Sequence, residues 1–154
     1  MSLVKTAGSV AVYDDGGKTL QAAEQLKLYS GYRMDTHAES YAWINLDHVK
    51  LTKMDEESEI EIRKDGKKLE IIVNSGNLFF NITEPLQEDE SLDIRTSNML
   101  VGIRGTCGWV ESSPDSTDSA IYVLEGTVEC AGGSGNTEKI SAGQKAAVAE
   151  EITV

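Results

Sequence analysis

Apolar and polar residues alternate with a period of two along most of this chain. In the segment SEIEIR, Ile60 and Ile62 fall on one side of the chain and the charged residues fall on the other. The same alternation recurs in three further segments, residues 41–47, 69–73 and 78–82. Alternation of this kind is typical of a β-strand with one buried face and one wetter face. The pattern therefore predicts a protein built from strands.

Turn-forming residues lie between these segments. Clusters of Asp, Asn and Gly predict turns at residues 14–17, 64–67 and 74–76. Residues 84–91 and 112–119 are too polar to enter a core, and we expect mobile loops there. Residues 18–28 contain good helix formers, but the run is short and we expect it to be extended. Many short strands separated by turns favour an all-β fold with little or no helix, an antiparallel jelly-roll or double-stranded β-helix-like sandwich.

A chain of 154 residues is long enough for one domain with a sizeable core. We interpret residues 1–6 as a short lead-in of cloning origin and residues 7–154 as a single β domain. On this interpretation the chain is an excised domain, and any leader or membrane anchor of the parent protein lies upstream.

The charge balance narrows the range of partners. There are 26 acidic and 14 basic residues, which gives a formal net charge of −12. Such a surface repels phosphate, so nucleic acid and anionic lipid are poor partners. No apolar run approaches the roughly 20 residues that a membrane-spanning helix needs. We therefore expect this fragment not to span a membrane.

The segment LVGIRGTCGWVE, residues 100–111, places three glycines inside a strand-like sequence. A phosphate-binding loop would need a helix after the glycines, yet Trp109 and Val110 continue the strand pattern. A catalytic thiol at Cys107 would need a base, and nothing places His37 or His48, the two histidines of the chain, beside it.

A structural corner remains, where glycines allow a bulge or a close backbone approach. In such a tight setting, Arg104 is a candidate bidentate partner for a carboxylate or for backbone carbonyls.

Three segments together resemble the FecR-type domain. They are LVGIRGTCGWVE, then IYVLEGTVEC, then ISAGQKAAV, and similar pieces extend the resemblance over residues 7–148. The residues that carry it are Gly102, Arg104, Gly105, Thr106, Glu125 and Gly126.

The resemblance implies an extracytoplasmic all-β domain, periplasmic or at the cell surface, without catalytic activity or cofactor. In signalling members the domain relays receptor occupancy to a cytoplasmic anti-sigma segment, so a protein partner or a neighbouring domain is expected. The parent protein is then membrane-anchored or secreted. Two features depart from the family: this chain has neither the membrane helix nor the cytoplasmic segment, and Cys107 stands where a small or aromatic residue is usual.

The two cysteines leave one question open. Cys107 and Cys130 both lie in strand-like segments, and an extracytoplasmic location permits a disulfide between them. Two buried free thiols fit the sequence equally well. Neither the cysteines nor the histidines have metal-ligand spacing, and the acidic clusters lack the spacing of a calcium-binding loop, so we expect no metal.

Outward-facing aromatic residues offer a candidate binding surface. The alternation places Tyr29, Tyr32, Tyr41 and Trp43 on the wetter side of their segments. A sugar or a peptide could stack on such rings. Two functions therefore compete: a non-enzymatic sensing or scaffolding module that acts through protein contacts, and a cell-surface module that binds carbohydrate or peptidoglycan. A cupin-like metal enzyme is disfavoured because the chain lacks a histidine cluster.

Overall fold

The computed structural model describes residues 1–113, 118–132, 135–148 and 152–154. These residues form seventeen strands and no helix, so the expected all-β class is confirmed. Residues 18–28, which we expected to be extended despite their helical propensity, contain two short strands and a turn.

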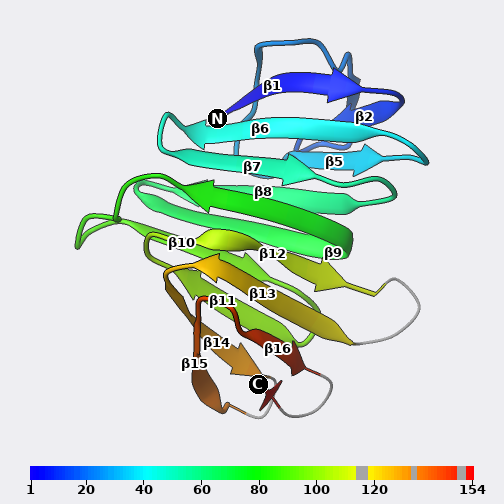
Figure 1. Ribbon diagram of the computed structural model, residues 1–154. Coiled ribbons are helices and arrows are strands. Elements are labelled where there is room, and N and C mark those ends of the chain that lie inside the picture. The colour runs from blue at the N-terminus through cyan, green and yellow to red at the C-terminus, as the bar shows by residue number, and fades with distance from the viewer. Residues whose placement is uncertain (114–117, 133–134, 149–151) are drawn as a thin grey trace.

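The strands form two ladders that share β9 (Figure 1). Ladder A runs in the order β4 (Leu26–Lys27), β1 (Ser2–Ala7), β6 (Tyr41–Asp47), β7 (Lys50–Met54), β9 (Lys68–Ile82), β12 (Cys107–Ser112), β13 (Ser119–Glu125), β16 (Lys145–Val148) and β17 (Ile152–Thr153). Ladder B runs in the order β3 (Thr19–Leu20), β2 (Val10–Tyr13), β5 (Arg33–Thr36), β8 (Glu59–Asp65), β9, β10 (Ser91–Arg95), β11 (Met99–Ile103), β14 (Thr127–Gly132) and β15 (Thr137–Ser141).

Together the two ladders make an open, mixed sheet. The pair β9–β10 is parallel, whereas the other pairings of the described strands are antiparallel. This arrangement does not establish the jelly-roll or double-stranded β-helix order that we expected.

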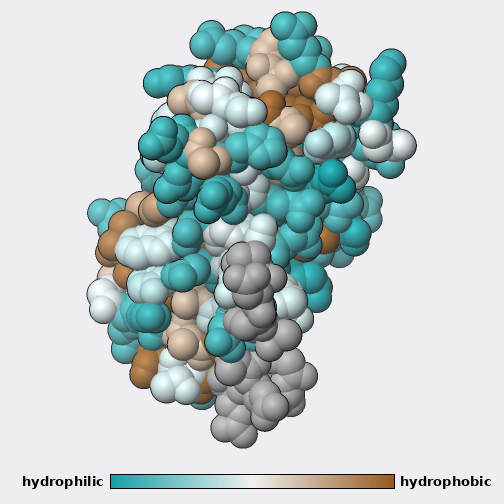
Figure 2. All heavy atoms as spheres, turned by 90° about the vertical axis from the view of Figure 1, so that its right-hand side faces the viewer, coloured by the Kyte–Doolittle hydropathy of each residue, from teal (hydrophilic) through white to brown (hydrophobic). Residues whose placement is uncertain are grey.

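One apolar core is built from the inward-facing residues of both ladders. In β8, Ile60 and Ile62 are fully buried, while the alternate residues Glu59 and Glu61 lie nearer to solvent. β6 repeats the pattern, with Ala42 buried. The alternation seen in the sequence is therefore the physical division between core and surface. Seen from the right-hand side of Figure 1, the exterior is mostly hydrophilic (Figure 2).

The turn predicted at residues 74–76 is wrong, because the chain continues there as one strand from Lys68 to Ile82. The first half of β9 pairs with β8 and β10, and the second half pairs with β7 and β12. Gly76 makes this passage possible: its φ is +89°, and a Cβ there would lie 2.1 Å from Ser58 Oγ. A glycine is needed at this position, but it does not form a turn. It allows β9 to continue from ladder B into ladder A.

Residues 2–7, which include most of the expected lead-in, form β1, and Leu3 is fully buried in the core. The division into a lead-in and a single domain stays a prediction. Of the predicted loop at 112–119, residues 114–117 lie outside the described part of the chain.

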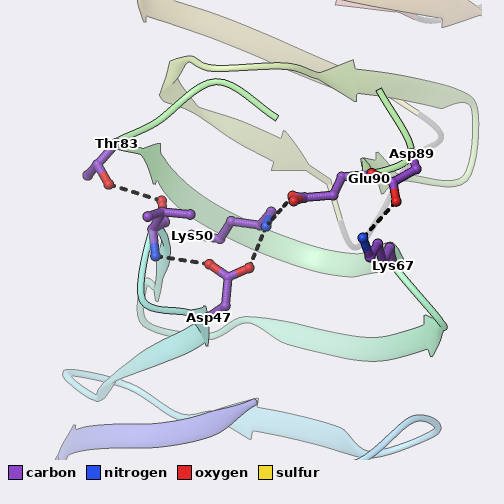
Figure 3. A network of polar contacts seen from close by, with 7 residues as sticks. Asp47, Lys50, Lys67, Thr83, Asp89 and Glu90 are labelled. Atoms are coloured by element: carbon purple, nitrogen blue, oxygen red, sulfur yellow. Dashed lines mark hydrogen bonds and ion pairs between the residues drawn. The ribbon is translucent and has the colours of Figure 1, made fainter. Parts of the chain in front are cut away.

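The acidic connection between β9 and β10 is held at several points (Figure 3). Lys50, whose side chain is only 4% exposed, forms ion pairs with Asp47 and, at 3.0 Å, with Glu90. Nearby, Lys67 pairs with Asp89 at 2.7 Å. The acidic residues from which we predicted a mobile loop therefore form ion pairs that hold the loop against the sheet.

Candidate functional site

The glycine-rich segment of residues 100–111 spans two strands. Gly102 lies on the outward side of β11, and β12 begins at Cys107 directly after a short bend. Since β12 is a strand, the helix N-terminus that a phosphate-binding loop requires does not exist at this place. The glycines must therefore be explained by packing.

The two halves of the motif meet where the chain passes between the ladders, from β11 to β12 and from β13 to β14. Gly126 has a φ of +81°, and a Cβ there would lie 2.6 Å from Thr106 Cγ2 and 2.7 Å from the Gly105 carbonyl oxygen. Thr106 is buried, and its carbonyl oxygen accepts a hydrogen bond from Ile82 N–H at 2.9 Å. Its hydroxyl oxygen has no hydrogen-bond partner among the described residues. Gly105, Thr106 and Gly126 thus form a packed corner.

Gly108 is the position where a side chain fits least. A Cβ at Gly108 would lie 2.1 Å from the Tyr122 carbonyl oxygen and 3.2 Å from Phe80 Cζ. The register between β12 and β13 also shifts between Cys107 and Gly108. The glycine allows a bulged backbone to approach its neighbour closely.

Arg104 and Glu125 lie at the surface. The Arg104 side chain forms no ion pair with a carboxylate of the described residues, and the bidentate contact with backbone carbonyls stays a prediction. Its carbonyl oxygen accepts a hydrogen bond from Leu86 N–H at 2.9 Å. The backbone of this motif, more than its charges, connects it to the rest of the fold.

Cys107 and Cys130 are both free thiols, so the disulfide that the sequence left open is not formed. Cys107 lies on β12 in ladder A, whereas Cys130 lies on β14 in ladder B, and these strands are not paired. Burial raises the pKa of Cys130 to about 11. Burial, and then the charge of Glu125, also raise the pKa of Cys107. Both shifts favour the protonated, unreactive thiol.

The four aromatic residues selected from the sequence do not form one surface. Tyr29 and Tyr32 form an edge-to-face pair with ring centroids 5.7 Å apart, beyond the end of β4. Tyr41 and Trp43 lie together on β6, with centroids 6.4 Å apart. Ring contacts join the residues within each pair, and the structure records none between the pairs for the described residues.

Trp43 belongs to a larger arrangement, which we call the aromatic–lysine row. It crosses seven strands of ladder A, and each member stands opposite the next in the strand register. Its members, in spatial order, are Lys5, Trp43, Lys53, Phe79, Trp109, Tyr122 and Lys145. All seven are at least partly exposed. Alternation could have placed each of them outward, but only the register shows that they are neighbours.

The rings of the row face one another along the sheet. Trp109 and Tyr122 are stacked, with centroids 4.4 Å apart and 11° between their planes, and Lys145 Nζ lies 4.8 Å from the Tyr122 centroid. At the other end, the Trp43 ring has Lys5 Nζ at 4.7 Å and Lys53 Nζ at 5.1 Å. Ring faces that already contact a ring or an ammonium group leave mainly their edges for solvent.

The outward face of ladder B differs in kind, because its arginines are paired with carboxylates. Four ion pairs lie there: Arg33–Asp35 at 3.7 Å, Arg33–Glu59 at 3.3 Å, Arg63–Glu61 at 3.1 Å and Arg95–Glu70 at 3.3 Å. The lysines of the aromatic–lysine row form no ion pair within the described part of the chain. The row is therefore the candidate interaction site of this protein.

Neither a cluster of metal ligands nor a membrane-spanning helix is found in the described part of the chain. Within residues 1–113, 118–132, 135–148 and 152–154, no three or more His, Cys, Asp or Glu side chains gather as metal ligands would. Nor does that part of the chain contain a helix with the length and apolar character needed to cross a bilayer.

Comparisons with known proteins identify relatives. The family model described as "FecR protein" matches residues 32–129. Two crystal structures of a candidate anti-sigma factor from Parabacteroides distasonis ATCC 8503, at 1.65 Å and 2.50 Å resolution, each superpose with a TM-score of 0.68 at 14% sequence identity. The match covers 79% of this chain and 57% of that protein, so the chain spans a little over half of its length. A comparison with curated proteins gives no match.

Proposed function

The chain belongs to the FecR protein family, and from that premise we propose that it is a regulatory domain without catalytic activity that acts through contacts with other proteins. The domain senses or transmits a signal, or holds a partner in place. Its partner is a protein or a neighbouring domain of the parent protein. The location is extracytoplasmic, with the parent protein anchored in a membrane or secreted.

The packing of the glycine motif carries this proposal. A phosphate loop or a catalytic turn would need open space around residues 102–108, yet the Tyr122 carbonyl oxygen fills the space at Gly108, and Gly105 and Thr106 themselves pack against Gly126. The raised pKa of Cys107 also disfavours the thiolate that nucleophilic catalysis requires. The motif is thus accounted for by packing, and the partly exposed outer faces of the ladders remain for recognition.

The likeness to the candidate anti-sigma factor from Parabacteroides distasonis concerns the fold. The proposed regulatory role rests instead on the family of this chain, whose FecR model matches residues 32–129. The carbohydrate-binding alternative stays a prediction and is less favoured. Sugar rings stack on open aromatic faces, whereas the faces of Trp43, Trp109 and Tyr122 already contact neighbours of the row.

Transcript levels in the organism that encodes the parent protein test this proposal. The gene is replaced by a version that lacks this domain, and RNA abundance is measured across the genome. A regulatory domain should change a defined set of transcripts. Complementation with the wild-type gene, or with a Cys107→Ser gene expressed at equal abundance, should restore them.

Two results would overturn the proposal. One is an unchanged set of transcripts after loss of the domain. The other is rescue by the wild-type gene but not by Cys107→Ser or Cys107→Ala, which would indicate thiol chemistry.

A further inference from the structure

We propose that the aromatic–lysine row binds an extended acidic segment of a partner protein, an inference that rests on the protein-contact function proposed above. The row lies across ladder A from Lys5 on β1 to Lys145 on β16. Neighbouring strands are about 4.8 Å apart, so seven strands give the row a length of about 29 Å. An extended peptide of about nine residues covers that distance.

The exposed atoms of the row favour negative charge. An aromatic ring is electron-rich on its faces and electron-poor at its edge. Here lysine ammonium groups and neighbouring rings occupy the faces: Lys53 Nζ alone lies 4.9 Å from the Tyr41 centroid, 5.1 Å from Trp43 and 5.9 Å from Phe79. The ring edges that remain are the electropositive part, and the ammonium groups between them add full positive charges.

Hydrogen-bond donors lie along the row, and one carboxylate lies beside it: Glu111 accepts a hydrogen bond from the Tyr122 hydroxyl at 3.4 Å. Each indole N–H can only donate, as can each ammonium group. Within the described residues, no hydrogen bond is recorded for Trp43 Nε1 or Trp109 Nε1, and neither atom is buried without a partner. Lys5, Lys53 and Lys145 likewise form no ion pair with the described residues. A ligand rich in carboxylate and carbonyl acceptors is the chemical complement of such a row.

The net charge of −12 opposes an acidic ligand at long range, and ionic strength decides how far this matters. At 0.15 M salt the Debye length is about 8 Å, so distant carboxylates are largely screened. The ammonium groups of the row lie within contact distance of a bound segment and are screened much less. The surface is therefore locally attractive although the whole protein is acidic.

Tryptophan signals give a direct test, because the chain has two tryptophans and both belong to the row. A peptide of ten glutamates is titrated into ¹⁵N-labelled protein at 0.05 M and 0.15 M salt. We expect both indole N–H resonances to shift in a saturable manner, with weaker binding at the higher salt. Lys53→Gln should weaken binding about fivefold, since it removes the central cation.

Lys139→Gln is the matched control, because Lys139 is an exposed lysine on β15 of ladder B and its loss changes the net charge equally. Wild-type binding with Lys139→Gln supports the proposal. Equal weakening by both variants would overturn it, because that result indicates a global charge effect. Unchanged indole resonances would also overturn it. Circular dichroism and the melting temperature confirm that both variants fold.

A polygalacturonate oligomer of similar charge separates a protein ligand from an acidic glycan. Saturable indole shifts with the oligomer but not with the peptide would overturn the proposal in favour of a glycan. The transcript experiment is independent of this result: a regulatory domain that fails to bind the peptide must use another surface, such as the exposed edge of β15.

Discussion

Trp109 on β12 and Tyr122 on β13 stack face to face, with ring centroids 4.4 Å apart and 11° between their planes. They are also direct partners in the strand register. Cross-strand aromatic pairs stabilise a sheet beyond the area that they bury. The pair therefore has two roles: it stabilises ladder A, and it lies towards the Lys145 end of the aromatic–lysine row.

A double-mutant cycle measures this contact. Trp109→Ala and Tyr122→Ala should each lower the free energy of unfolding, and the double variant should lose less than their sum, by about 0.5–1.5 kcal/mol. Urea denaturation of the four proteins gives the values. Tyr29→Ala combined with Trp109→Ala is the control, because no ring contact joins these residues. Additivity in the Trp109–Tyr122 cycle would contradict the stacking.

Glycine substitutions test whether the glycines of the motif are required by close packing. Gly108→Ala should lower the free energy of unfolding by about 3 kcal/mol or more, because its methyl group would meet the Tyr122 carbonyl oxygen at 2.1 Å. Gly102→Ala in the same motif should be neutral or slightly stabilising, since the nearest atom lies at 3.6 Å and alanine loses less entropy. Chemical denaturation compares the two variants, and equal effects would refute this interpretation of the motif.

Acid should weaken the fold partly through Asp47. Burial acts to raise the pKa of the Asp47 carboxyl group, but hydrogen bonds from Lys50 and from backbone N–H groups outweigh it and hold the pKa below its ordinary value. A lowered pKa stabilises the folded state at pH values above the unfolded-state pKa of about 3.9, and this contribution disappears as pH falls through the lower folded-state pKa.

The difference in free energy of unfolding between wild type and Asp47→Asn should thus be constant near pH 6 and shrink below pH of about 4. Denaturation curves between pH 2 and pH 7 test this. A difference that stays the same down to pH 2 would mean that the carboxylate is not stabilised by Lys50.

The connection between β9 and β10 should loosen when its inner contact is lost. Glu90→Gln removes the negative charge that pairs with Lys50, whose side chain is only 4% exposed. We expect faster amide hydrogen exchange at residues 84–90, measured by mass spectrometry. Asp89→Asn should have a smaller effect, because both partners of its ion pair with Lys67 are exposed, and water and salt screen their attraction. Faster hydrogen exchange in Asp89→Asn than in Glu90→Gln would contradict the prediction that the contact with Lys50 matters more.

Thiol titration tests the state of the cysteines. In unreduced, denatured protein, Ellman's reagent should detect both Cys107 and Cys130. In native protein at pH 8, Cys130 should not react, because it is fully buried and its pKa is raised to about 11. Cys107 should react slowly. A denatured protein without free thiols would show that the two cysteines pair after all.

Much of the fold could be predicted from local patterns. Alternation identified the buried faces of β8 and β6, where Ile60 and Ala42 lie in the core. The same reasoning failed at residues 74–76, where the chain continues as a strand. A glycine that ends a strand looks the same in sequence as one that allows a strand to approach a neighbour closely, as Gly76 approaches Ser58. Only the neighbouring chain distinguishes the two cases.

The candidate site was predicted less well than the fold. Tyr41 and Trp43 lie at outward positions of β6, as alternation predicts, and Tyr29 is also exposed. Tyr29 and Tyr32, however, lie on another part of the surface. Phe79, Trp109 and Tyr122 were not selected, although each lies at an outward position of an alternating segment. Their importance comes from their neighbours and not from their local sequence.

The sequence by itself determined which side chains face the core and which face solvent, because a strand directs successive side chains to opposite sides. It also determined where glycine was needed, but not for what purpose. Only the tertiary structure decided that Trp43 stands beside Lys53 and that Trp109 stands beside Tyr122. The physical reason is that hydrogen-bonded register joins residues that are far apart in the chain, and no local pattern encodes which strands pair.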